Sequence, residues 1–161
     1  MTTSRDDLNT AITELQRRKK DGEIPDRLLA RQALVALGRI ALAEDDASAG
    51  TLVKSLQEAC AAFEQRWEDA VNSEVSLAVN EHVQGVDPHY LDTPEYDFAY
   101  TIAARERLEA RLRAVDLLGH AVDESLLDQI ADADALLAPY LDGTRPGYHP
   151  DPSQEMGQDS Q

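Results

Sequence analysis

The sequence has almost no cysteine, few aromatic residues and little basic charge. Cys60 is the single cysteine of the 161 residues, which excludes an intramolecular disulfide and a thiolate-rich metal site. Cys60 falls on an apolar helical stripe, and this position predicts a buried, unreactive thiol. Aromatic residues make up only 5% of the chain, and leucine and alanine carry most of its apolar weight. This composition favours packed helices over a β-sandwich.

Several sequence signals that assign a protein to a class are also missing. The segment Met1–Asp7 has no apolar stretch of the secretory type, and no uninterrupted apolar run approaches the length of a membrane span. We therefore expect a cytoplasmic protein with no membrane partner. Glycine-rich phosphate loops, paired-cysteine zinc motifs and the Glu-x-x-His repeats of di-iron bundles are absent. These absences favour a protein that is not an enzyme, and no residue is assigned as catalytic.

Negative charge dominates the sequence. The net charge is −16, and half of this excess lies in the last 39 residues. Such a field repels nucleic acid and anionic membranes, so neither is expected as a direct partner. The acidic surface has two interpretations: ordinary solvation, or a surface that docks on a basic protein or mimics DNA.

The apolar residues recur at intervals of three and four, which predicts helices and no strands. Five helices are expected, over residues 4–20, 25–44, 51–84, 94–118 and 124–137. The helix 51–84 would be roughly 50 Å long, against a radius of gyration near ~14 Å for a compact domain of this size. It must therefore kink, for example at Asn72 and Ser73, or meet a second chain. We expect a homodimer formed along this helix.

The predicted fold class is therefore all-α, a single-domain helical bundle of about five helices with a long third helix. The bundle is assigned to residues 1–141. Residues 142–161 consist mainly of Gly, Pro, Asp, Ser and Gln, which have little to bury, so a disordered acidic tail is expected there.

One candidate site lies on the apolar stripe around Trp67. On a helical wheel, Glu74 falls about 20° and Glu81 about 40° from Trp67, where a core helix would carry leucine. A buried carboxylate needs a cation, a metal or a raised pKa. The alternative is that the stripe drifts toward Val79 and His82, which leaves both glutamates at its margin.

Arg107 and Arg111 complete this candidate. Neither has an acidic residue three or four positions away, and they lie four residues apart on one predicted helix. Such arginines are expected to reach carboxylates on another helix or to bind an anion. If the helices 51–84 and 94–118 form an antiparallel hairpin, Glu74 lies level with Arg107. The leading interpretation is a buried Glu74–Arg107 ion pair, with an anion site at Arg107 and Arg111 as the alternative.

A second candidate site surrounds the irregular segment 85–92. Imidazole and carboxylate groups gather there within 17 residues: Glu81, His82, Asp87, His89, Asp92 and Asp97. Such groups suit zinc, iron or manganese, or general acid–base chemistry. Their spacing matches no metal template, so no cofactor is predicted and a divalent metal held by Glu81, His82, Asp87, His89 and Asp97 is the alternative.

The sequence thus predicts a non-enzymatic helical module that docks on a protein partner as an adaptor, chaperone or assembly subunit. The first alternative is a bundle that binds a metal or a small anion between the helices 51–84 and 94–118, which includes the case of an enzyme. The second alternative is an acidic DNA mimic that inhibits a DNA-binding protein.

Overall fold

The computed structural model describes residues 3–43 and 46–142, and this part of the chain is helical with no strand. Its elements are α1 Ser4–Asp21, α2 Arg27–Ala43, α3 Asp46–Cys60, the 3-10 turn η1 Ala61–Phe63, α4 Gln65–Gly85, α5 Pro88–Leu91, α6 Phe98–Leu117 and α7 Glu124–Leu141. The predicted all-α class is confirmed. Of the predicted tail 142–161, all but the first residue lies outside the described residues. None of the described helices is both long and apolar enough to cross a membrane.

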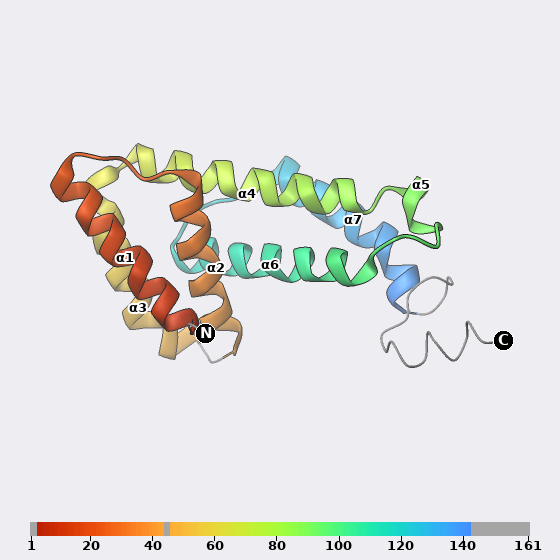
Figure 1. Cartoon of the computed structure of the whole chain (residues 1–161), viewed down its shortest axis with the longest axis horizontal. Coiled ribbons are helices and arrows are strands. Elements are labelled where there is room, and N and C mark those ends of the chain that lie inside the picture. Colours follow the sequence, from red (N-terminus) through yellow and green to blue (C-terminus); the bar gives the residue numbers. More distant parts are fainter. Residues whose placement is uncertain (1–2, 44–45, 143–161) are drawn as a thin grey trace.

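The central element is α2, as Figure 1 shows: α1 and α3 lie on one side of it, and α4, α6 and α7 extend to the other. It packs on α1, α3, α4 and α6. This position explains its sequence, which is apolar around most of its circumference. The main core joins buried side chains of all these helices, while a smaller cluster lies between α7 and the segment that precedes α6.

The contact between α2 and α6 depends on Gly38. A Cβ atom added to Gly38 would lie 1.8 Å from the backbone carbonyl oxygen of Ala110. Only glycine fits there, because that oxygen belongs to the backbone of α6 and not to a side chain that could rotate away. The two helices therefore cross with their backbones almost in contact.

The helix ends agree with the sequence in α1 and differ in α7. Thr3 caps α1 by accepting a hydrogen bond from the Asp6 backbone, and Gly22 ends it with a φ of 73°. The predicted end of the last helix at residue 137 is wrong, because α7 continues through Pro139 to Leu141. Tyr140 explains the extension: it is buried, and its hydroxyl donates to Asp92 at 2.6 Å.

The predicted long helix 51–84 is wrong. The chain leaves the α-helix at η1 and turns at Glu64, whose φ is 52°, before α4 begins. This break, and not one at Asn72 and Ser73, lets α3 pack on α1 and α2 while α4 packs on α2, α6 and α7. With the helix divided, its length no longer supports a homodimer.

The segment between α4 and α6 also differs from its prediction. Residues 88–91 form the single turn α5, where a loop was expected. Thr93 does not cap the next helix, because its hydroxyl donates backward to the Tyr90 carbonyl oxygen at 2.7 Å. Asp97 is the cap instead, accepting from the Tyr100 backbone at 3.0 Å, so α6 starts four residues later than predicted.

Candidate functional site

Glu74 lies in the core where α2, α4 and α6 meet, and it is only 1% exposed. Its Oε1 accepts from Arg111 Nε at 2.9 Å, and its Oε2 accepts from Arg27 Nη1 at 2.9 Å. The structure therefore places Arg111, one helical turn beyond the expected Arg107, beside the buried carboxylate. Glu81, the other glutamate expected to point inward, is exposed.

This network is structural. Arg111 is 3% exposed, and its burial lowers the pKa of the guanidinium, an effect that the Glu74 charge opposes. Both carboxylate oxygens of Glu74 already accept charge-assisted hydrogen bonds. Both oxygens therefore bind arginines of the fold itself.

A second polar network joins α4, α6 and α7. The buried His82 contacts Asp134 Oδ1 through Nε2 at 2.8 Å, and Asp134 also accepts from Arg105 Nε at 2.9 Å and Nη2 at 3.0 Å. Burial raises the pKa of Asp134, but the hydrogen bonds from Arg105 and His82 outweigh it, so this pKa lies below its usual value. Nδ1 of His82 has no hydrogen-bond partner among the described residues.

The five residues of the alternative metal site are not brought together. Glu81 and His89 are exposed, His82 contacts Asp134, and Asp87 and Asp97 cap α5 and α6. Over residues 3–43 and 46–142, no group of three or more His, Cys, Asp or Glu side chains is placed to hold a metal ion. Cys60, predicted to be buried, is buried, and burial raises the pKa of its thiol to about 12.

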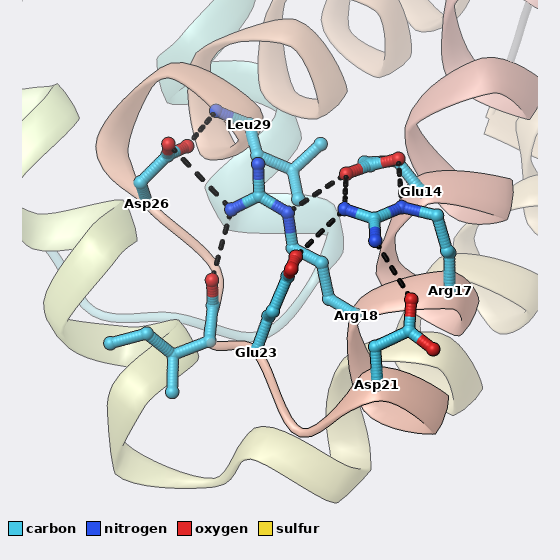
Figure 2. Close-up of polar contacts among 8 residues, drawn as sticks. Glu14, Arg17, Arg18, Asp21, Glu23, Asp26 and Leu29 are labelled. Atoms are coloured by element: carbon cyan, nitrogen blue, oxygen red, sulfur yellow. Dashed lines mark hydrogen bonds and ion pairs between the residues drawn. The ribbon is translucent and has the colours of Figure 1, made fainter.

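The turn between α1 and α2 neutralises its arginines, as Figure 2 shows. Arg17 donates to both oxygens of Glu14, at 3.0 and 2.7 Å, to Asp21 at 2.9 Å and to Glu23 at 2.8 Å. Arg18 shares Glu14 at 3.0 Å and donates to the Ile24 carbonyl oxygen at 2.9 Å. These contacts fix the turn and occupy both arginines.

The arginines of α2 and α6 that face outward behave differently. Among the described residues, four arginines make no hydrogen bond or ion pair with another described residue: Arg31, Arg39, Arg66 and Arg107. Three of the four line one groove of about 360 Å³ that runs over α2. Among the described residues, Asp7 of α1 is the only acidic one on its lining, and Gln32 Nε2 donates to the Asp7 carbonyl oxygen at 3.4 Å.

Apolar side chains accompany these arginines. Leu28 is 58% exposed and Leu42 is 52% exposed, and Val35 between them is half-buried. At 100° per residue, these three residues and Arg31 and Arg39 span an arc of about 80° on α2. We call this surface the arginine face: Leu28, Arg31, Val35, Arg39 and Leu42 of α2 with Arg107 of α6.

The sequence contained a signal for this face that the prediction missed. Arg31 and Arg39, like Arg107, have no acidic residue three or four positions away. The same rule that singled out Arg107 and Arg111 therefore applies to α2. Only the structure separates them, since it buries Arg111 against Glu74 and leaves the other three arginines at the surface.

A larger groove, of about 500 Å³, lies between α4 and the connection from α6 to α7. Its lining includes His120 and one carboxylate, Asp123. Asp123 caps α7 by accepting from the Ser125 backbone at 2.9 Å. Because this carboxylate already serves the fold, the groove is a weaker candidate than the arginine face.

No protein-family model matches the chain, and no curated protein or solved structure matches it. Function is therefore argued from the geometry of the chain itself.

Proposed function

We propose that this chain is a cytoplasmic, non-enzymatic protein-interaction module whose arginine face binds an acidic amphipathic helix. One observation carries the proposal: a chain of net charge −16 keeps three arginines without a described carboxylate partner, beside two largely exposed leucines. Arginine and large apolar groups together are typical of the residues that dominate binding energy at interfaces. The buried free thiol of Cys60 agrees with a reducing compartment.

The shape of the face favours a helix over a small anion. Leu28 and Leu42 are fourteen residues apart, which corresponds to about 21 Å along α2. A ligand must offer apolar contacts along this length and carboxylates between them. A helix with leucines at seven-residue intervals and flanking acids does both, as helices that bind in grooves generally do.

Charge restricts where such a partner binds. Arginine holds carboxylates through two parallel hydrogen bonds, so acids of the partner gain most where they meet Arg31, Arg39 or Arg107. Elsewhere the acidic surface repels an acidic partner. The combination directs the partner to this one face.

The test is the affinity of the full chain for a synthetic helix. The probe is a fluorescein-labelled, stapled 18-residue peptide with leucine at every seventh position and flanking glutamates, and anisotropy reports its binding. The double variant R31E/R39E is expected to weaken binding by about tenfold or more, which corresponds to roughly 1.4 kcal/mol.

The matched control is Arg66→Glu, since Arg66 is exposed on α4 and also lacks a described partner but lies off the groove. It should bind as the parent does. Equal binding by R31E/R39E and the parent contradicts the proposal. If inorganic phosphate competes at the peptide's own affinity, the groove is a small-anion site instead. The DNA-mimic alternative stays a prediction.

A further inference from the structure

Resting on the function proposed above, we propose that the helix bound by the arginine face is α7 of a second copy of this chain. The earlier argument for self-association came from the length of one helix, and the break at η1 removes it. The present argument comes from the match between two surfaces of the described structure.

The first of the two matching surfaces is a row of acidic residues on α7. The helix Glu124–Leu141 carries four acidic residues and no lysine, arginine or histidine. Asp134 is held by Arg105 and His82. The other three, Glu124, Asp128 and Asp132, are exposed, and their side chains make no hydrogen bond or ion pair with any residue that the structure describes. Spaced four apart, they form one ridge along the helix. We call these three residues the acidic ridge.

The spacing of the arginines on α2 matches the spacing of the acids on α7. Arg31 and Arg39 are eight residues apart on α2, and Glu124 and Asp132 are eight residues apart on α7. Both pairs therefore span about 12 Å along their helices. When α7 of one copy lies along α2 of another, both ion pairs form together. Asp128, between the two acids, is then available to Arg107.

The apolar groups agree as well. Leu127 and Leu136 flank the acidic ridge on opposite sides, and they are 45% and 46% exposed. Ala131 lies beside the ridge and Ala135 lies just beyond its last acid, and both are exposed, so α7 can approach another helix closely. On the arginine face, the exposed Leu28 and Leu42 are the apolar groups that Leu127 and Leu136 would contact. The contact would thus combine leucine packing with ion pairs.

The two surfaces belong to different parts of the molecule. Figure 1 shows α7 toward the end of the molecule away from α1 and α3. The acidic ridge is the face of α7 that turns away from its own fold, since Ile130, Ala133 and Leu137 fill the buried face. If α7 of each copy docks on the arginine face of the other about a two-fold axis, the contact occurs twice and closes a dimer. Without such an axis, the contact repeats from copy to copy and forms a longer assembly.

The experiment is sedimentation velocity of the full chain over a wide concentration range at low salt. The mass should rise with concentration above the 17.7 kDa of one chain. Two charge reversals, R31E/R39E and E124R/D132R, should each raise the dissociation constant by about tenfold or more. In an equimolar mixture of the two variants, the reversed face of one meets the reversed ridge of the other with inverted charge. The unchanged face and the unchanged ridge can pair as in the parent, so the mixture should associate as the parent does. The control Glu58→Arg, an exposed acid of α3, should leave the mass unchanged.

Circular dichroism confirms that each variant keeps its fold. A parent chain that stays monomeric at every concentration overturns the inference, and so does a mixture of the two reversed variants that fails to associate. The proposed function is judged separately. If the synthetic helix binds in an Arg31- and Arg39-dependent way to a monomeric chain, the arginine face is a docking site for another protein. If neither the helix nor a second copy binds, both proposals are wrong.

Discussion

The two faces of α2 differ in whether the chain itself satisfies them. On the inner face, Gly38 meets the backbone of Ala110 with no space for a methyl group, and Arg27 reaches the buried Glu74. On the outer face, Arg31 and Arg39 have no described partner, and Leu28 is largely exposed. On one face of α2, the charged and apolar groups are therefore paired or packed within the fold. On the other face, the arginines have no described partner and the leucines are largely exposed. The outer face is where a partner is expected.

The turn between α1 and α2 shows that exposed arginine alone is not the signal. Arg17 is exposed, like Arg31 and Arg39 of α2, yet three carboxylates bind it. Removing Arg17 from the turn would leave Asp21 and Glu23 without their cation, whereas removing Arg31 leaves no acid unpaired among the described residues. The distinction between a structural and a functional arginine thus rests on the partner and not on exposure.

The largest effect is expected at the centre of the inner network. Glu74→Gln leaves Arg111 buried without its counter-charge, so the free energy of unfolding should fall by about 3–5 kcal/mol. Urea denaturation followed by circular dichroism measures this change. The control is Glu81→Gln on the same helix, which is exposed and should change stability by no more than about 0.5 kcal/mol. Similar values for the two variants would mean that Glu74 is not a buried ion pair.

The next largest effect is expected at the crossing of α2 and α6. Gly38→Ala forces the two backbones apart, and overpacking of this kind costs about 3 kcal/mol. Gly50→Ala is the matched control, because Gly50 lies in α3 with nothing within 4 Å of an added Cβ atom. It should stabilise the chain by up to about 1 kcal/mol, as alanine does in exposed helices. Thermal denaturation of both variants should therefore shift in opposite directions.

The sequence predicted the parts of this fold that depend on local pattern. The helix 4–20 was correct because its cap, its apolar face and Gly22 all agree. The break before Glu64 was missed because the segment Ala61–Phe63 contains no glycine or proline. The helix breaks there because α3 and α4 pack on different sets of helices. Local propensity is overridden there by tertiary packing.

For the candidate site, the sequence predicted the burial of Glu74 but not its arginine partner. The helical wheel indicated that Glu74 lies on the apolar stripe, but not which cation meets it, since a hairpin that shifts by one turn exchanges Arg107 for Arg111. A metal site at the loop acids stayed open as an alternative because capping and metal binding use the same side chains, Asp87 and Asp97 among them. Register and capping geometry are properties of the assembled fold, so spacing alone does not supply them.

The smallest effect is the one that separates the two kinds of arginine most directly. Arg18→Met keeps the apolar stem but loses the bonds to Glu14 and to the Ile24 carbonyl oxygen, so it should cost about 1 kcal/mol of unfolding free energy. Arg31→Met loses no described bond and removes a positive charge that acts on Arg111, so its effect should stay within about 0.5 kcal/mol. Chemical denaturation of both variants beside the parent makes the comparison. If Arg31→Met costs as much as Arg18→Met, Arg31 has a partner inside the fold, and the outer face of α2 is as complete as the inner one.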